Sequence, residues 1–172
     1  RTAELQALLM HDALTGLPNR RALMQTLPDA MHRAARAHKP CALLFLDMDG
    51  FKSVNDTHGH EEGDELLRQF GARLLEAVRK TDLVARLAGD EFVVVLESLG
   101  DAQDAYEKAD NLLGALRSPY TLKRATVSVG ASIGVALHLP GDAQDLDAWL
   151  ARADGAMYVA KRGGKNTVAL AA

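Results

Sequence analysis

The sequence has 172 residues, of which 48% are hydrophobic, and this is enough to form the core of a single domain. Its 20 Lys and Arg against 23 Asp and Glu give a net charge of −3, which argues against a broad cationic surface for nucleic acid or anionic lipid. No apolar run reaches the roughly 18 residues of a membrane span, and the N-terminus lacks a signal-peptide pattern, so we expect this part of the chain to be soluble. The single cysteine, Cys41, begins an apolar run and is expected to be buried.

The first 40 residues favour two helices separated by a loop. Residues 1–11 favour a helix that begins abruptly, without a capping residue, as expected of the end of a longer helix. A glycine and Pro18 end this helix. Asn19 can then cap a second helix that extends to about Ala37, within which Pro28 predicts a turn or a kink.

A central strand and a long helix are predicted next. Residues 41–46 are continuously apolar, which is typical of a strand buried on both faces, and they lead into Asp-Met-Asp-Gly at 47–50. A tight turn then leads into a short helix, and a longer helix is predicted over about 61–79 with one buried face. The apolar residues expected on that face are Leu66, Leu67, Phe70, Leu74, Leu75 and Val78.

The second half of the sequence predicts a hairpin followed by alternating helices and strands. Two short apolar runs, at 83–87 and 92–96, are separated by Ala-Gly-Asp-Glu, which is the pattern of a β-hairpin. Trp149 and Met157 lie on the apolar side of the last helix, so we expect them in the core. The elements predicted after the hairpin are a helix at 101–117, a strand at 127–137, a helix at 145–161 and a closing strand at 167–170.

Carboxylates from two distant segments are predicted to meet at one end of the sheet. Asp47 ends the central strand, and Asp90 and Glu91 lie at the tip of the hairpin. A Mg²⁺ ion bound by few protein ligands needs such an arrangement, with phosphate oxygens completing its coordination. Acids at strand ends and turns are also common as solvated residues, and residue order does not decide between the two interpretations.

Two segments are candidates for binding phosphate. The turn at residues 50–55 would direct backbone N–H groups at an anion, with Lys52 beside them. Lys161 and Lys165 lie at a glycine-rich helix end. Each lysine has an ordinary alternative role, Lys52 as a solvated surface residue and the other two as cations that offset the helix dipole.

Six ordered segments resemble the motifs of one protein family. Residues 86–92 (Arg-Leu-Ala-Gly-Asp-Glu-Phe) resemble the signature of the GGDEF family, the diguanylate cyclases. The other five segments resemble further family motifs in the same order and spacing, and the resemblance extends from Asp12 to about Asn166. These segments are residues 12–20, 47–56, 59–64, 132–136 and 153–161.

The resemblance implies a fold and a domain organisation. Residues 12–172 would form one palm-like α/β domain, with a central, mainly antiparallel sheet flanked by helices, similar to class III nucleotidyl cyclases. Residues 1–11 would be the C-terminal end of a linker helix from an upstream sensory or regulatory domain, in a bacterial signalling protein that is cytoplasmic or the cytoplasmic part of a membrane-bound protein. A homodimer would be the active form, because each subunit supplies half of an active site.

The reaction that the resemblance implies condenses two GTP molecules into cyclic di-GMP and two pyrophosphates. Two Mg²⁺ ions per active site would assist it, with Mn²⁺ as an alternative. By position in the motifs, Asp47 and Asp90 would bind metal, with the Met48 backbone carbonyl as a further ligand. Glu91 would act as a metal ligand or as the general base, and Lys52 is the remaining implied catalytic residue.

The resemblance also implies the substrate-binding residues. Asn55 and Asp64 would recognise guanine through groups that hydrogen-bond along its edge. Many family members have Arg in place of Lys165, so a point charge would replace a bidentate contact here. The other substrate-binding residues are Phe51, Lys52, Lys161 and Lys165, of which the three lysines would contact phosphate.

Two further features concern regulation and the signature itself. Arg79 and Asp82 precede the signature at the spacing of the family's RxxD site, where the product cyclic di-GMP would bind and inhibit; a surface ion pair is the alternative. Ala88 replaces the first glycine of the signature. Alanine would cost about 1 kcal/mol or more if this position needs a positive φ, and nothing if it needs only a small side chain.

Two other functions are compatible with the same fold. A receptor domain would bind cyclic di-GMP or GTP without turnover, but the retained Asp47 and Asp90 argue against it. A different cyclase would use ATP or form a mixed dinucleotide, but Asn55 and Asp64 in the guanine register argue against that.

Overall fold

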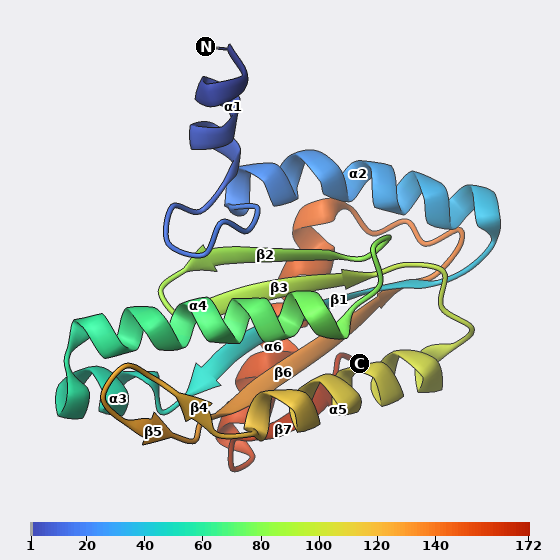
Figure 1. Cartoon of the computed structure of the whole chain (residues 1–172). Helices are drawn as coiled ribbons and strands as arrows, with labels where there is room; N and C mark the ends of the chain where they lie inside the picture. The colour runs from blue at the N-terminus through green and yellow to red at the C-terminus, as the bar shows by residue number, and fades with distance from the viewer. Residues whose placement is uncertain (1) are drawn as a thin grey trace.

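The computed structural model describes residues 2–172, without the side chains at positions 6 and 7, and its centre is a five-stranded sheet (Figure 1). The strand order is β2-β3-β1-β6-β7, and all neighbours are antiparallel except β6 and β7, which are parallel. This confirms the expected mainly antiparallel sheet. Its strands are β1 (Cys41–Asp49), β2 (Leu83–Ala88), β3 (Glu91–Leu96), β6 (Gly130–His138) and β7 (Thr167–Leu170).

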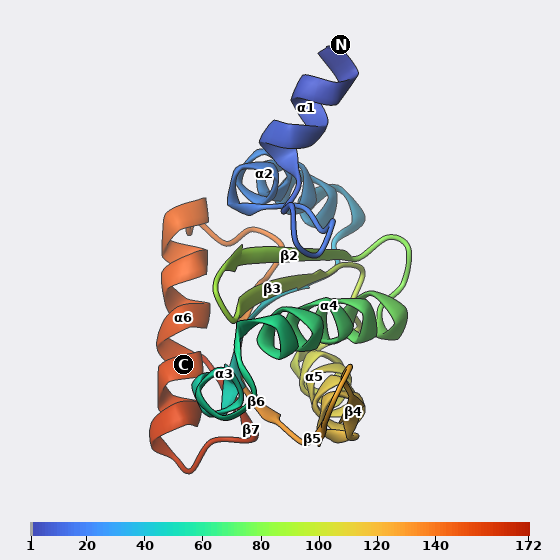
Figure 2. The same cartoon turned by 60° about the vertical axis from the view of Figure 1, so that its left-hand side comes forward.

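Helices cover both faces of the sheet and give the domain three layers (Figure 2). One face is covered by α4 and α5, and the other by α2 and α6. The helices are α1 (Thr2–Met10), α2 (Arg20–Ala37), α3 (Phe51–His58), α4 (His60–Ala77), α5 (Ala102–Arg117) and α6 (Leu146–Arg162). A small second sheet, of β4 (Tyr120–Thr121) and β5 (Thr126–Val127), follows α5.

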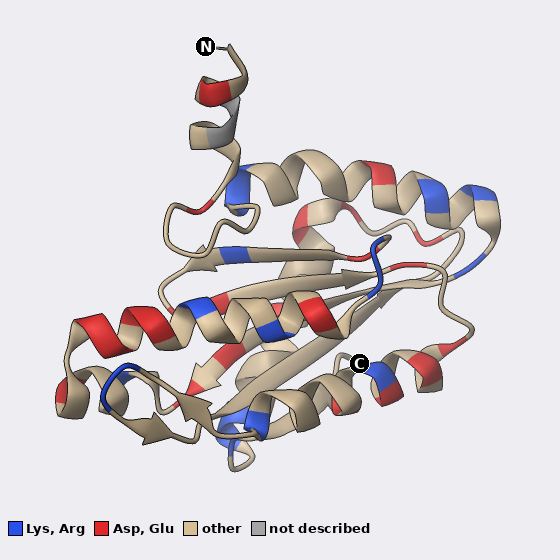
Figure 3. Ribbon diagram, in the orientation of Figure 1, with Lys and Arg blue, Asp and Glu red and all other residues tan. Residues whose placement is uncertain are grey.

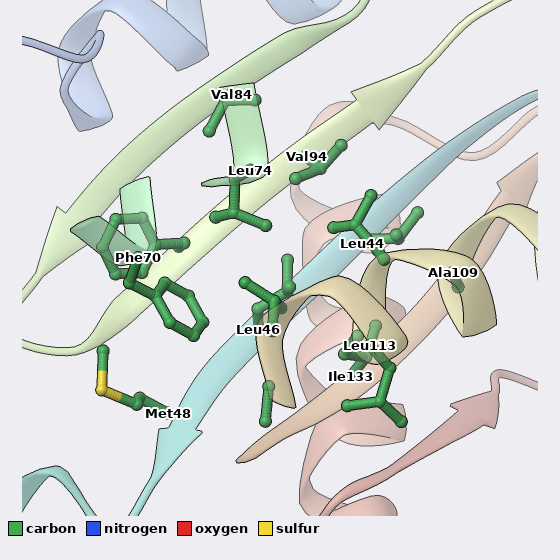
Figure 4. Packing of buried hydrophobic residues seen from close by; sticks show 14 of the residues in the cluster. Leu44, Leu46, Met48, Phe70, Leu74, Val84, Val94, Ala109, Leu113 and Ile133 are labelled. Atoms are coloured by element: carbon green, nitrogen blue, oxygen red, sulfur yellow. The ribbon is translucent and has the colours of Figure 1, made fainter. Parts of the chain in front are cut away.

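The central position of β1 explains its continuously apolar sequence. Alternate side chains of a strand point to opposite faces, so Leu44 and Leu46 enter one core and Leu43 enters the other. Figure 4 shows the first core, in which Phe70 of α4 and Leu113 of α5 pack near this strand. Because both faces are covered, the strand has no solvated side on which polar residues would be favoured.

The second core confirms three expectations about single residues. Cys41, Trp149 and Met157 are all buried there. The Trp149 indole N–H donates to the Ala136 carbonyl at 2.8 Å, so its one polar group is satisfied. Burial raises the pKa of the Cys41 thiol to about 12, which leaves it unreactive near neutral pH.

Two local predictions are wrong, and one alternative of a third is excluded. Pro28 causes no turn, because α2 is continuous through it. Leu75 is 56% exposed, because it is rotated by about 100° around α4 from Leu74, the last residue on the buried face of the helix. The strand predicted from residue 127 begins at Gly130, since Val127 pairs with Tyr120 in the small sheet instead.

The first helix projects away from the rest of the domain (Figures 1 and 2). Its Leu5, Leu8 and Leu9 side chains are exposed. Of the helix expected over residues 1–11, Arg1 lies outside the described residues. Throughout residues 2–172, no helix combines the length and the apolar character needed to span a membrane.

Candidate active site

The end of β1 and the tip of the β2–β3 hairpin meet at one end of the sheet. The register of β1 and β3 places Asp47 opposite Glu91, and the Met48 N–H donates to the Asp90 carbonyl at 3.2 Å. Figure 3 shows acidic residues where β1 ends. The structure therefore brings together the carboxylates of the two segments, as the sequence predicts.

Asp47 is paired with one lysine and keeps one oxygen free. The Lys161 Nζ of α6 lies 2.7 Å from Asp47 Oδ2, whereas Oδ1 is buried and has no hydrogen-bond partner among residues 2–172. Partial burial alone would lower the pKa of Lys161, but the hydrogen bond and charge of Asp47, with the charges of Asp90 and Asp49, raise it above its ordinary value. Lys161 therefore stays protonated and balances one of the nearby negative charges.

Asp90 and Glu91 hold their protons more tightly than ordinary carboxyl groups, although only Asp90 lies in the hairpin turn and Glu91 is the first residue of β3. Burial and the neighbouring Asp47 carboxylate raise the pKa of Asp90 to about 7. Burial, together with the charges of Asp47 and Asp154, also raises the pKa of Glu91. Burial and the repulsion between these carboxyl groups both disfavour their charged forms, and Lys161 balances only one negative charge of the cluster.

This surplus of negative charge fits a divalent cation. Within residues 2–172, no three Asp, Glu, His or Cys side chains are arranged to hold a metal by themselves. The free Asp47 oxygen and the Asp90 carboxyl group nevertheless offer hard oxygen ligands, which suit Mg²⁺ or Mn²⁺. A metal with so few protein ligands would need the oxygens of a substrate, such as phosphate, to complete its coordination.

The predicted guanine-binding residues lie on two consecutive helices. Asn55 belongs to α3 and Asp64 to α4. The Asn55 side chain lies so close to Gly63 that a Cβ there would come within 1.8 Å of Asn55 Oδ1, so this approach requires glycine. Asn55 Oδ1 is buried without a hydrogen-bond partner among the described residues, and Asp64 is exposed. The position therefore offers an unsatisfied acceptor near an exposed carboxylate.

The predicted phosphate-binding residues are less closely grouped. Phe51 and Lys52 begin α3, where Phe51 packs against the core and Lys52 is exposed. Lys161 contacts Asp47, as described above. Lys165 is exposed in the loop after α6, with a left-handed backbone at φ +66°. Of these three lysines, Lys161 is the one that pairs with an acid in the described part of the chain.

The predicted inhibitory residues form a hydrogen-bonded cluster at the open end of the β2–β3 hairpin, opposite its turn. The Asp82 side chain is 2% exposed and accepts from the Arg79 N–H at 3.0 Å and the Glu97 N–H at 3.1 Å. The Arg79 guanidinium donates to the Asp82 carboxylate and to the Glu97 carbonyl. A cavity of about 190 Å³ adjoins both residues and is also lined by Lys108 and Asn111. A ligand entering it would compete with the protein for the Arg79 guanidinium.

The signature hairpin accommodates its alanine without strain. Ala88 pairs with Glu91, so the turn consists of Gly89 and Asp90. The residue with positive φ is Gly89, at +50°, and Ala88 is not among the described residues that share this conformation. Of the two alternatives for Ala88, the structure therefore supports the one in which only a small side chain is needed.

An ion pair that was not predicted ties the hairpin to the start of the domain. Arg86 Nη1 lies 2.9 Å from Asp12 Oδ1, and Arg86 Nε donates to the Gly89 carbonyl at 2.9 Å. Its backbone N–H also donates to the Pro18 carbonyl. Both partners lie in segments that carry family motifs, but they are 74 residues apart, and no spacing rule pairs them. Arg86 thus links the entry loop to the turn that carries Asp90.

The raised pKa of Asp90 predicts how its removal changes stability. An unfolded Asp ionises near 3.8 and the native one near 7, so native stability is lost as pH rises from about 4 to 7. We expect Asp90→Asn to raise the free energy of unfolding by about 1–2 kcal/mol at pH 8 without metal, and by close to zero at pH 4. Urea unfolding of both proteins with a chelator measures this. An equal difference at the two pH values would contradict the assignment.

Comparison with curated proteins identifies the family. A sequence model described as "Diguanylate cyclase, GGDEF domain" matches residues 9–167. MucR of Pseudomonas aeruginosa, a bifunctional diguanylate cyclase/cyclic di-GMP phosphodiesterase, is 45% identical over 95% of this chain and 24% of its own length. The diguanylate cyclase TpbB of the same species is 42% identical over 94% of this chain and 37% of its own length. The chain thus spans about a quarter to somewhat over a third of these relatives.

Solved structures share the fold over nearly the whole chain. The GGDEF domain of TpbB superposes with a TM-score of 0.89 at 42% identity, covering 94% of each chain. The coiled coil and GGDEF domain of DgcB from Caulobacter crescentus, solved in complex with c-di-GMP, gives a TM-score of 0.88 at 26% identity, covering 99% of this chain and 90% of that one. With the family match and the acids at the hairpin tip, these similarities show that the chain is a GGDEF domain of the diguanylate cyclase family.

Proposed function

We propose that this domain condenses two GTP molecules into cyclic di-GMP with release of two pyrophosphates. The observation that carries the proposal is the pair formed by Asp47 and Asp90, in which one Asp47 oxygen is buried without a partner among residues 2–172 and the pKa of Asp90 is raised to about 7. Asn55 adds a second unsatisfied acceptor, suited to the N–H donors of guanine. GTP is a cytoplasmic metabolite, so the proposal places the domain in the cytoplasm.

In the proposed reaction, the 3′-hydroxyl of one GTP attacks the α-phosphorus of the other. A bond forms between O3′ and the α-phosphorus, and the bond to the β-phosphate oxygen breaks, so that pyrophosphate leaves. The same step with the roles exchanged closes the ring. The raised pKa of Glu91 makes its carboxylate a better proton acceptor than an ordinary glutamate, and we assign it the hydroxyl proton.

The remaining site residues bind and orient the substrate. Asp47, Asp90 and the Met48 carbonyl would hold Mg²⁺, two ions per site or Mn²⁺ in their place, and the bound metal would neutralise phosphate charge and lower the pKa of the attacking hydroxyl. Lys161, protonated beside Asp47, would contact the same phosphates. Lys52 and Lys165 would hold the outer phosphates beside Phe51. Positioning the two nucleotides in this way accounts for most of the rate enhancement we expect.

The proposed reaction needs two copies of the domain. Each copy offers one Asn55 and one acid pair, so two GTP molecules must be presented by two facing half-sites. The exposed leucines of α1 give a surface on which two such helices can pair, and we propose that residues 1–11 are the end of a linker from a regulatory domain. Activity should therefore depend on protein concentration.

Product inhibition through Arg79 gives a separate prediction. Arg79→Ala removes a charged donor for the phosphate or guanine of bound product, so we expect half-inhibition to need about tenfold more cyclic di-GMP. Initial turnover should change by less than about twofold, because the cluster lies away from the acid pair. The measurement is the initial rate against added cyclic di-GMP, with Lys80→Ala, an exposed neighbour, as control. Unchanged inhibition would mean that Arg79 and Asp82 form an ordinary surface ion pair.

Product analysis tests the proposed function. The domain is incubated with Mg²⁺ and GTP, ATP or an equal mixture, and the nucleotides are separated and identified by mass. We expect cyclic di-GMP from GTP, no cyclic dinucleotide from ATP, and cyclic di-GMP as the main product of the mixture. Binding of GTP without turnover would indicate a receptor, and a product that contains adenine would indicate a different cyclase.

A further inference from the structure

Asp49 is the second acid at the end of β1, and the proposed reaction does not use it. Both of its carboxylate oxygens are occupied by the protein. Oδ1 accepts from the Ser132 hydroxyl at 2.9 Å, and Oδ2 accepts from the Asn166 backbone N–H at 2.7 Å. Asp47, two residues earlier on the same side of the strand, has a buried oxygen with no partner among residues 2–172. The two acids therefore differ in role, because Asp49 is hydrogen-bonded to the loop after α6, whereas Asp47 has an oxygen available for a ligand.

That loop has an unfavourable backbone conformation. Gly164, Lys165 and Asn166 all have positive φ, at +117°, +66° and +49°. Only four non-glycine residues of the described chain have positive φ, and two of them are adjacent here. The left-handed conformation is unfavourable for residues other than glycine, so the loop keeps it only where its surroundings hold it.

The contacts that hold the loop converge on Asn166. Besides Asp49, the Arg117 side chain donates to Asn166 Oδ1 at 3.1 Å and to its backbone carbonyl at 3.4 Å. Gly130 leaves room for this arrangement, because a Cβ there would come within 2.5 Å of Asn166 Oδ1. Asn166 is thus held by Asp49 of β1 and Arg117 of α5, and the residue before it is Lys165.

We infer that Asp49 is a positioning residue, which holds the Gly164–Asn166 loop through the Asn166 N–H and thereby fixes where Lys165 is presented to the substrate. The inference rests on the proposed function, in which Lys165 contacts the triphosphate. According to this inference, Asp49 affects nucleotide binding by positioning Lys165 and not by binding a metal.

A double-mutant cycle tests this inference, with binding of 3′-deoxy-GTP in the presence of Mg²⁺ as the readout. This nucleotide lacks the attacking hydroxyl, so binding is measured without turnover. We expect Asp49→Ala and Lys165→Ala each to weaken binding by about tenfold, and the double variant to be no weaker than either one. Asp49→Ala combined with Lys52→Ala should instead show the product of the two separate effects, because Lys52 lies on α3.

Two further variants separate positioning from charge and from folding. Asp49→Asn keeps an oxygen for the Asn166 N–H, so it should bind within about threefold of wild type. Arg117→Ala removes an exposed side chain that holds the same loop, and we expect a weakening that disappears in the Lys165→Ala background. This variant keeps the test valid if Asp49→Ala unfolds the domain.

The outcomes distinguish the inference from the proposed function. If wild type does not bind 3′-deoxy-GTP, the proposed function and the inference both fail. If wild type binds the nucleotide, but Asp49→Ala or Arg117→Ala weakens binding just as much in the Lys165→Ala background as in wild type, only the inference is overturned. It is also overturned if Asp49→Asn weakens binding as much as Asp49→Ala, because the negative charge would then be what matters.

Discussion

Replacing Asp90 by Asn should reduce cyclic di-GMP formation by about a thousandfold or more while the domain stays folded. The amide has almost the same shape as the carboxyl group but carries no charge, so it removes a ligand oxygen without leaving a cavity. Asp90 lies in the two-residue turn of the hairpin, and the other acid of the pair, Asp47, lies near the end of β1. Asp47→Asn should have an equally large effect, because it removes the free buried oxygen.

The measurement for both variants is the initial rate of cyclic di-GMP formation at saturating GTP and Mg²⁺. Thermal unfolding checks that each variant is folded. Asp110→Asn, which neutralises an exposed acid on α5, is the matched control and should keep full activity. Turnover by Asp90→Asn within about tenfold of wild type would rule out the carboxyl pair as the reaction centre.

Preference for GTP over ATP should be about a hundredfold or more in kcat/KM. Guanine presents two neighbouring donors, N1–H and the 2-amino group, which can satisfy the free oxygen of Asn55 and the carboxylate of Asp64. Adenine has an acceptor at N1 and no 2-amino group. It would leave these groups unpaired at roughly 1–3 kcal/mol each, and each 1.4 kcal/mol is a factor of ten.

Asp64→Ala should narrow this preference by weakening the use of GTP. The change removes a contact to guanine and creates none to adenine, so kcat/KM for ATP should stay nearly constant. Asp56→Ala, which removes an exposed acid next to Asn55, is the control and should leave the ratio unchanged. Both nucleotides are compared at one fixed protein concentration, so that assembly does not alter the ratio. Equal use of ATP and GTP by wild type would overturn the guanine assignment.

The parts of the fold that were predicted correctly are those with a strong local pattern. The apolar run that begins at Cys41 indicates a strand covered on both faces, and the two runs at 83–87 and 92–96 indicate a hairpin. The turn of this hairpin is shorter than the predicted four residues, because Ala88 and Glu91 extend the two strands and pair with each other. The small sheet was missed because its strands have two residues each, too few for any alternation to be recognised. Leu75 was wrongly placed in the core because a helical pattern does not fix the width of the buried face.

The candidate site shows the same division between local and tertiary information. The meeting of Asp47 and Asp90 was predictable, because an antiparallel hairpin returns next to the strand it pairs with. The difference between Asp47 and Asp49 was not, since it depends on Asn166, which is 117 residues away from Asp49 in the chain. The link from Asp12 to Arg86 was likewise invisible to spacing. Such pairings depend on packing that no local pattern specifies.

The central claim, that two half-sites each contribute an acid pair to make cyclic di-GMP, is tested most directly by mixing subunits. Wild type and Asp90→Asn are combined at fixed total concentration, allowed to exchange subunits, and assayed for cyclic di-GMP. Closing the ring needs both half-sites, so the rate should follow the square of the wild-type fraction. A rate that falls in direct proportion to the wild-type fraction, or no cyclic di-GMP from wild type alone, would contradict the account.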